Sequence, residues 1–513
     1  MKPSRIATIL LGILLVNAAA ILFFRYFITI DGPMHVLHAS LQKAPWPSPE
    51  HAAHGFTYYC GMRSLGDAIT AVLLLFLEPQ HAHDVFATLV SSAVVIAAVA
   101  FLRAQGTRVG IPILWLVPVM FNTLFILGLF HFLLGVAISL GSVAWWKWHA
   151  EKPRIRWFGL LVGMALAWFT HRGAPALLCL FMFPTYLFEL RQERRTAFLT
   201  DPRERNKWLA SGAVILLIGA FQLHRVLEII NVPIPTSLPP FTRTFLLKTL
   251  FIFDQTKEKW LILGIGLLLL ISIATGIWAR WRLGRKLVWH DVLIILFLVL
   301  FAITWLTNSP HGRRLIVSDR VHWLALVVLV LWLIAIADNA RGIAARIIGG
   351  AAICALPLQV IRLTQAERSF STLEPSHMLT MEACAALEPN SIVLSVMAGS
   401  DRMQQHIQAY VATKHNGILV APTEFLLSYG PYARTKKTDW LRFSRDPNWL
   451  LRHWREGIPP EVDQVLFIGQ GIDQKVSKHP WPTLLGERFQ PSFENEFARI
   501  YTAVRDTSIS TSR

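Results

Sequence analysis

The sequence predicts a polytopic α-helical membrane protein, with about 11 transmembrane helices and a C-terminal soluble α/β domain. Three observations predict it. The 513 residues are 54% hydrophobic and only 16% charged, whereas soluble chains carry about 25% charged residues. The apolar residues form blocks long enough to cross a hydrocarbon core of roughly 30 Å. These blocks stop near residue 361, after which charged residues become frequent. An ordinary soluble enzyme, a disordered chain and a disulfide scaffold are therefore excluded.

The first apolar block covers residues 6–27 and follows Lys2 and Arg5. Small residues at 17–20 would suit signal-peptide cleavage, but the apolar run continues past them and favours an uncleaved anchor. A shorter apolar stretch at 69–77 suits an interfacial or re-entrant helix. The other spans are expected at 85–102, 110–126, 128–146, 157–170, 175–189, 208–227, 260–279, 288–306, 321–337 and 343–361.

Basic residues orient these spans. Of the 49 Lys and Arg residues, 20 fall in the loops assigned to the cytoplasm and 12 in the outer loops before Arg362. The positive-inside rule then predicts a multi-pass protein of the inner (cytoplasmic) membrane, with its N-terminus in the cytoplasm and its C-terminal domain outside. The net charge of +17 is accordingly a topology signal, and no nucleic acid is expected as a partner.

The chain is expected to divide by composition. Residues 1–361 form the transmembrane domain, with a large first outer loop at 28–84, residues 362–506 form the extracytoplasmic α/β domain, and 507–513 form a flexible tail. Strand-like runs occur at 391–396, 417–421, 465–468 and 500–504, and 402–413 is a helix candidate. Cys60 and Cys384 are both expected outside. Whether they pair is left open, because nothing in the sequence requires it.

Asp31 is the most informative polar residue, because it follows the first span directly and opens a long outer loop. Long loops seldom serve only to connect two elements, although an acidic residue at a span exit can simply be solvated. His35 lies four residues later and either orients Asp31, contacts a substrate or only forms an interfacial hydrogen bond. Asp67 and Asp84 border the short apolar helix, where helix caps or helix-start charges are favoured.

Motifs for nucleotide chemistry are missing from the sequence. It contains no P-loop, no Gly-rich dinucleotide turn, no Asp-x-Asp pair and no Cys/His cluster with zinc spacing. No residue is therefore assigned to a metal, no cofactor is required, and a divalent metal is left open.

The chain resembles the GT-C superfamily of integral-membrane glycosyltransferases. The resemblance rests on a first span followed by Asp31-Gly32-Pro33-Met34-His35, a long first outer loop, many further spans and an outer α/β domain. The stretch 128–135 and Ser318-Asp319-Arg320 are also similar to family patterns. Relatives include protein O-mannosyltransferases and the aminoarabinose transferase that modifies lipid A. Gly32 replaces the second member of the acidic pair of the mannosyltransferases, which leaves metal dependence and subfamily open.

The resemblance implies inverting transfer of a sugar from a polyprenyl-phosphate donor, and each chemical task has candidate residues. Asp31 is expected to act as general base toward the acceptor hydroxyl, assisted by His35. Arginines suit the leaving phosphate; lipid headgroups and pairing with Asp319 are the alternatives for them. The candidate phosphate contacts are Arg313, Arg314 and Arg320 in an outer loop at 311–320, and Arg172. His131, His171 and Asp319 are candidate substrate contacts, with an interhelical hydrogen bond as the alternative for His131.

The expected partners are the polyprenyl-phosphate sugar donor, an acceptor that is a lipid, a glycan or a protein, and the lipid bilayer. One alternative is a lipid-linked glycan polymerase or ligase, which would transfer a whole glycan from a similar donor. Another is a transporter of lipids or glycolipids. The spans carry few charged residues, which argues against a transporter, because transport sites place polar groups near the membrane midplane.

Overall fold

The computed structural model describes residues 3–22, 29–43, 64–171, 173–192, 255–284, 288–307, 313–340, 342–389, 391–398, 418–420 and 462–504, with a few shorter pieces between them. The chain separates into two compact units. Unit 1 contains Met1–Phe24, Gly61–Gly66 and Ala87–Ser369, and unit 2 contains Arg25–Cys60, Asp67–Phe86 and Phe370–Arg513. Unit 2 thus combines most of the first outer loop with the C-terminal residues. The linear domain bounds expected from the sequence stay a prediction.

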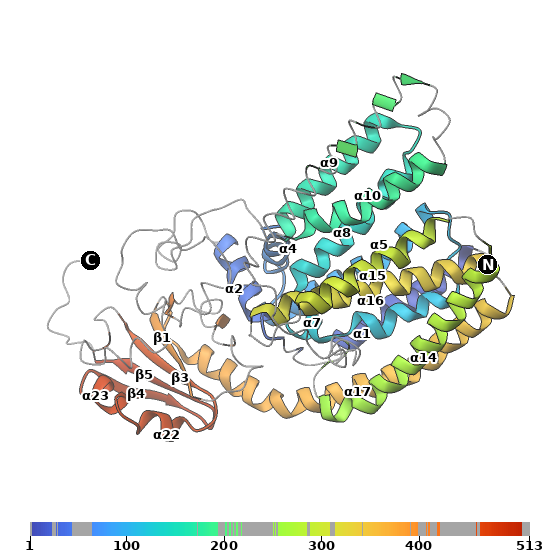
Figure 1. The fold of residues 1–513 in the computed structure, drawn as a ribbon. Helices are drawn as coiled ribbons and strands as arrows, with labels where there is room; N and C mark the ends of the chain where they lie inside the picture. Colours follow the sequence, from blue (N-terminus) through green and yellow to red (C-terminus); the bar gives the residue numbers. More distant parts are fainter. Residues whose placement is uncertain are drawn as a thin grey trace. The chain divides into compact units, whose positions relative to one another are not determined.

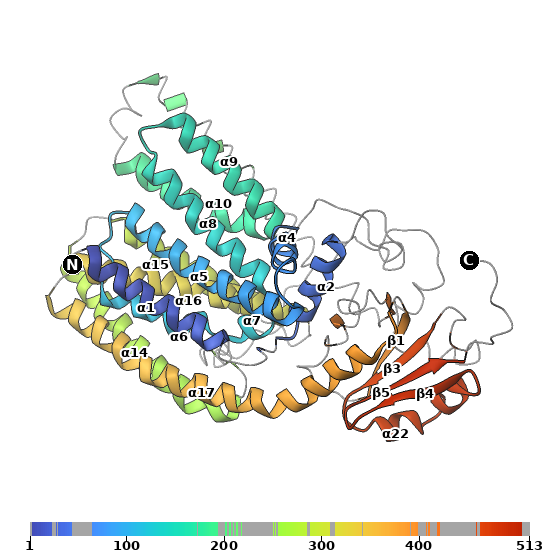
Figure 2. The ribbon, with the colours of Figure 1, turned by 180° about the vertical axis from the view of Figure 1, so that it is seen from behind.

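Unit 1 is helical. Its elements are α1 (Pro3–Leu22), the greater part of α5 (Pro79–Ala104), η1 (Ile111–Trp115), α6 (Leu116–Met120), α7 (Thr123–Ile126), α8 (Phe130–Trp148), α9 (Pro153–Thr170), α10 (Ala174–Gln192), α14 (Gln255–Arg282), α15 (Trp289–Thr307), α16 (Arg313–Ala340) and the first part of α17 (Gly342–Ala386). In both views α8, α9 and α10 lie side by side (Figure 1, Figure 2). The central helix is α16, which contacts α14, α15, η1 and α6.

Six of the described helices are long and apolar enough to cross a membrane by length and composition, which confirms the predicted fold class. They are Pro79–Ala104, Phe130–Trp148, Ala174–Arg191, Thr256–Arg282, Asp319–Ala340 and Gly342–Ala386, and two shorter apolar segments lie at Ile111–Met120 and Trp289–Thr304. The count of eleven spans stays a prediction, because parts of the expected spans, 208–227 above all, lie outside the described residues.

The expected span at 110–126 is not one helix. It consists of η1, α6 and α7, with an extended backbone at Phe121 and Asn122. Proline contributes to this division, since Pro112 and Pro118 lack the N–H that a continuous helix needs. Asn122 then caps α7, because its side-chain oxygen accepts from the backbone N–H groups of Leu124 and Phe125. Hydropathy locates the apolar segment correctly but does not register these breaks.

Unit 2 is built on a five-stranded sheet in the order β2-β1-β3-β5-β4. The strands are β1 (Ile392–Met397), β2 (Ile418–Val420), β3 (Gln464–Ile468), β4 (Phe489–Glu494) and β5 (Ala498–Ala503). Strand β1 pairs in parallel with β2 and β3, while β5 is antiparallel to β3 and β4. The four strands expected from the sequence are confirmed. Strand β4 was not predicted, because its middle residues are exposed and do not favour strands: Gln490 and Ser492 are polar, and Pro491 lacks the N–H that a strand donates.

Two apolar clusters pack against this sheet. One contains α22 (Ile472–Val476), α23 (Trp481–Leu485) and residues of β3, including Val465 and Phe467; Figure 1 shows the two short helices beside the strands. The other joins Leu466 and Ile468 to the end of α17 and to α2 (Gly32–Lys43). From α2 it takes Met34, Val36 and Leu37. Burial of these side chains anchors the helix that follows Asp31 to the C-terminal domain.

Candidate active site

Asp31 stands at the start of α2 in unit 2. It is half-buried, and its backbone carbonyl accepts from the N–H groups of Met34 (3.1 Å) and His35 (3.2 Å). Pro33 occupies the first turn, where the missing proline N–H costs nothing. The carboxylate is thus attached at the end of the helix where the backbone dipole favours negative charge. This position fits both a helix-start role and a fixed carboxylate that faces a substrate.

A chain of hydrogen bonds in unit 2 holds the turn before α2. The Thr29 hydroxyl oxygen lies 2.9 Å from Nε2 of His83, and Nδ1 of His83 lies 3.1 Å from a carboxylate oxygen of Asp84. The same oxygen accepts from the Gln80 side-chain amide at 3.1 Å. The Tyr410 hydroxyl donates to the Gln80 carbonyl at 2.7 Å. All five side chains are buried.

The partners of His83 define its tautomer. An ionised Asp84 only accepts hydrogen bonds, so Nδ1 of His83 carries the proton, and Nε2 of the neutral ring accepts from the Thr29 hydroxyl. Asp84 therefore orients His83 from within α5. The helix-start role considered for Asp84 from the sequence is replaced by this one, because α5 begins at Pro79, more than a turn earlier.

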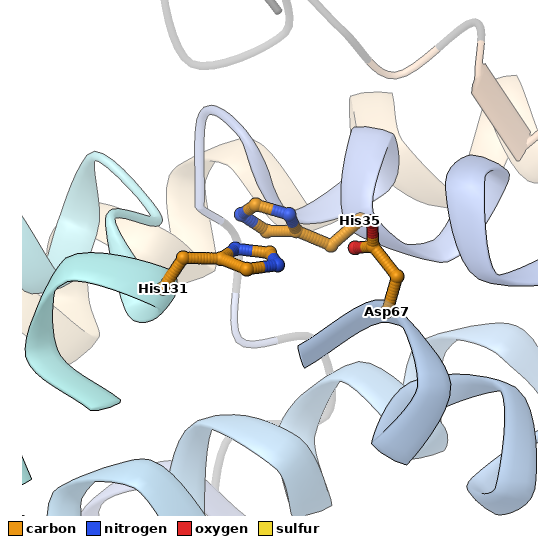
Figure 3. A group of neighbouring side chains, drawn as sticks. All are labelled: His35, Asp67 and His131. Atoms are coloured by element: carbon orange, nitrogen blue, oxygen red, sulfur yellow. The ribbon is translucent and has the colours of Figure 1, made fainter. Parts of the chain in front are cut away.

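His35 and Asp67 come together in the same unit (Figure 3). His35 lies on α2 and Asp67 in the first turn of α4 (Ser64–Leu73), and both are buried. A ring nitrogen of His35 and a carboxylate oxygen of Asp67 lie within 4.8 Å of one another. Such a pair can orient the imidazole or supply two ligands to a divalent cation. Figure 3 also labels His131, a buried residue in the first turn of α8 that belongs to unit 1.

Unit 1 brings together His171 and Arg320, two of the predicted residues. The Arg320 Nη1 atom lies 3.5 Å from Nε2 of His171. The Phe132 ring supports both: it meets the His171 ring edge-on at 5.6 Å between centroids, and the Arg320 guanidinium carbon lies 5.8 Å from its centroid. Trp323, one turn after Arg320, packs edge-on against the same ring. Three elements, α8, α16 and the α9–α10 connection, therefore supply one aromatic and basic cluster.

The tautomer of His171 decides what this cluster can bind. The backbone N–H of Gly173 donates to Nδ1 of His171 at 3.0 Å, so Nδ1 is unprotonated and the proton of the neutral ring sits on Nε2. Nε2–H and the Arg320 guanidinium are then both donors, and neither can accept from the other. Donors that converge in this way suit an anion such as a phosphate.

The backbone and packing of unit 1 explain the two glycines of the stretch at 128–135. Gly128 has a φ of 77° and ends α7, a conformation that side chains rarely adopt. A Cβ at Gly135 would lie 2.7 Å from the Cβ of Ala174, so glycine lets α8 and α10 approach closely. The Ser139 hydroxyl reaches the carbonyls of Gly135 and Ala174. This contact fixes the start of α10, and with it His171, against Phe132.

The structure corrects one part of the predicted phosphate site. An outer loop was expected at 311–320, but α16 begins at Arg313 and contains the whole Arg-Arg-Leu-Ile-Val-Ser-Asp-Arg stretch, which has neither glycine nor proline to prevent a helix. Asp319 is half-buried on this helix. The side chains of Arg313 and Arg314, as well as Arg172 and Cys60, lie outside the described residues; Cys384 is buried in the core of unit 2.

The fold and the two sites define a class of protein: a polytopic helical membrane protein with a C-terminal α/β domain, with buried histidines beside acidic groups and a half-buried histidine beside an arginine. No protein-family model matches the sequence, and no curated protein does. Among solved structures, the chain is similar to ArnT from Cupriavidus metallidurans in the apo state, with a TM-score of 0.52, 10% identity and all of both chains covered. It is similar to the same protein bound to undecaprenyl phosphate, with a TM-score of 0.51, 11% identity and the same coverage. At this identity the likeness shows the fold alone, which is the polytopic helical membrane protein with a C-terminal domain that the sequence predicts.

Proposed function

We propose that the protein is a GT-C-type glycosyltransferase that moves a monosaccharide from a polyprenyl-phosphate donor to an acceptor on the extracytoplasmic side of the inner membrane. The fold supports the proposal, because one structure of the similar protein ArnT contains undecaprenyl phosphate. The observation that carries it is the pair of donors in unit 1, Nε2–H of His171 and the Arg320 guanidinium, set against Phe132. The acceptor is a lipid, a glycan or a protein.

Arg320 and His171 are proposed to bind the donor phosphate. During transfer the bond between the anomeric carbon and the phosphate oxygen breaks, and negative charge grows on that oxygen. Two positioned N–H donors stabilise this charge more than they stabilise the intact diester, so they lower the barrier. Arg172, Arg313 and Arg314 are proposed as further phosphate contacts, and Asp319 as a substrate contact or as their ion-pair partner.

Asp31 is proposed to accept the proton of the acceptor hydroxyl while its oxygen attacks the anomeric carbon from the side opposite the phosphate. The new C–O bond forms as the bond to phosphate breaks, with inversion at the anomeric carbon and polyprenyl phosphate as the leaving group. His35, held beside Asp67, is proposed to orient the acceptor or Asp31. His131 is proposed as a further substrate contact.

Asp31→Asn tests this proposal. Membranes that contain the full-length variant are supplied with labelled polyprenyl-phosphate sugar, and the release of polyprenyl phosphate is followed. We expect transfer to fall at least about a thousandfold, because the amide cannot accept the proton. The matched control is Asp473→Asn, an exposed acid of unit 2 whose side chain is 85% accessible, which should transfer normally.

Near-normal transfer by Asp31→Asn would remove Asp31 as the base. Transfer of an intact oligosaccharide instead of one sugar would favour the lipid-linked glycan polymerase or ligase. Movement of the labelled lipid across the membrane without release of polyprenyl phosphate would favour a transporter.

A further inference from the structure

We propose that unit 1 contains a second binding site, for an anionic phospholipid, in a cavity of about 710 Å³. The cavity lies between the end of α5, the start of η1, the end of α16 and the start of α17. None of its lining residues belongs to the proposed transfer site. The inference therefore stands independently of the proposed function.

The rim of the cavity is basic. Arg103, Arg108 and Arg346 line it and are exposed, and Asp338 supplies the single carboxylate of the lining. That carboxylate already accepts from the backbone N–H of Arg108 at 2.8 Å. Three guanidinium groups around one carboxylate leave an excess of positive charge, and guanidinium groups match phosphate oxygens in geometry as well as in charge.

The remainder of the lining is apolar, which favours a lipid over a small soluble anion. Ile111 and Ile353, which are 43% and 48% exposed, join Pro112 and Ile334 in the lining. Gly349 and Gly350 leave part of the wall without side chains, and a Cβ at Gly350 would meet nothing within 4 Å. The acyl chain of a lipid whose headgroup lies at the arginines would thus lie against this apolar part of the lining.

A buried hydroxyl at the cavity points to a ligand independently of the arginines. Thr107 lines the cavity and is 4% exposed, and within the described part of the chain its hydroxyl oxygen has no hydrogen-bond partner. A buried polar group without a partner is costly, so such groups are normally satisfied by protein, water or ligand. Rotation of the Thr107 side chain toward the cavity would let a phosphate or glycerol oxygen of the lipid accept from it.

The predicted topology assigns the lipid site to the cytoplasmic leaflet of the membrane. Arg103, Arg108 and Arg346 are among the basic residues assigned to the cytoplasmic side. Basic groups at that surface attract anionic lipids. Basic residues that only set the membrane topology need charge alone. This site, in contrast, combines charge with a cavity, an apolar wall and a buried hydroxyl.

Native mass spectrometry of the full-length protein tests the site, with phosphatidylglycerol and phosphatidylcholine offered at equal concentration. We expect one tightly held phosphatidylglycerol. We also expect the triple variant Arg103→Gln/Arg108→Gln/Arg346→Gln to weaken its binding at least about tenfold, while Arg154→Gln, an exposed arginine at the start of α9, leaves it unchanged. Equal losses in both variants would indicate diffuse surface charge and overturn the site.

Gly350→Leu separates the lipid from a soluble phosphate. Leucine fills the apolar part of the cavity without changing charge, and the open space at this position lets the variant fold, which its thermal unfolding in phosphatidylcholine verifies. We expect phosphatidylglycerol binding to fall about tenfold. Unchanged binding, or displacement of the lipid by millimolar glycerol 3-phosphate, would show that no acyl chain occupies the cavity.

Discussion

The ring of His83 occupies the space that a side chain on Gly32 would need: a Cβ at position 32 would stand 2.2 Å from Nε2 of His83. It would also stand 2.3 Å from the Thr29 hydroxyl oxygen. His83 cannot easily withdraw, because Thr29 and Asp84 hold its two ring nitrogens. This packing explains why the residue after Asp31 is not the second acid that the mannosyltransferase pattern expects. A carboxylate at position 32 has no room.

Gly32→Ala should therefore displace the turn that carries Asp31. We expect a loss of about 1–3 kcal/mol in the free energy of unfolding, as for other overpacked sites, and a larger loss of transfer, because the carboxylate moves. Thermal unfolding in detergent and the transfer assay measure the two effects. Gly141→Ala in α8, where a Cβ meets nothing within 4 Å, is the control and should be neutral or slightly stabilising. Equal behaviour of the two variants would contradict the packing argument.

In the Arg320–His171 pair, phosphate binding should depend on the forked N–H donors of the guanidinium as well as on its positive charge. Arg320→Lys keeps the charge but loses the paired donors and the cation–π contact of the guanidinium with Phe132. We expect the KM for the polyprenyl-phosphate donor to rise about tenfold or more. The control Arg282→Lys changes an exposed arginine that lies over Trp278 and should transfer as the wild type does. An unchanged KM in Arg320→Lys would exclude a specific phosphate contact.

The sequence predicted features that depend on neighbouring residues and missed features that depend on contacts between residues far apart in the chain. The helical membrane fold could be predicted because burial in lipid demands long apolar runs, and four strands could be predicted because β-branched residues recur in short runs. The loop expected at 311–320 was wrong, because basic charge indicates a membrane boundary but does not end a helix. The proximity of His35 and Asp67 was missed, since it depends on how α2 and α4 pack within unit 2 and leaves no pattern in the sequence. The network through Asp84 was missed for the same reason.

Asp67 should matter for transfer although its position in the sequence is that of a helix-start charge. With a carboxylate oxygen within 4.8 Å of His35, Asp67 can fix the orientation of the imidazole, so we expect Asp67→Asn to lower kcat about tenfold with little change in thermal unfolding. A chelator added to the wild type distinguishes the two uses of the pair. A cation held by His35 and Asp67 makes transfer sensitive to chelation, and that sensitivity disappears in the variant. Full activity of Asp67→Asn would leave Asp67 with its helix-start role alone.

The buried phenol of Tyr410 makes the stability of unit 2 sensitive to alkaline pH. Burial raises the pKa of Tyr410 well above its ordinary value, and the charges of Asp84 and Cys384 raise it further. The unfolded chain loses this proton near pH 10, whereas the folded chain keeps it. The stabilisation is therefore complete below about pH 10 and is lost as the pH rises toward the pKa of Tyr410 in the folded protein.

Tyr410→Phe should lack this alkaline loss and cost about 1 kcal/mol at neutral pH through the missing hydrogen bond to Gln80. Gln80→Leu is the comparison variant: it removes the same hydrogen bond, together with the one from Gln80 to Asp84, but keeps the phenol, so its unfolding temperature should still fall steeply above pH 10. Identical pH profiles for the two variants would show that Tyr410 does not cause the alkaline transition.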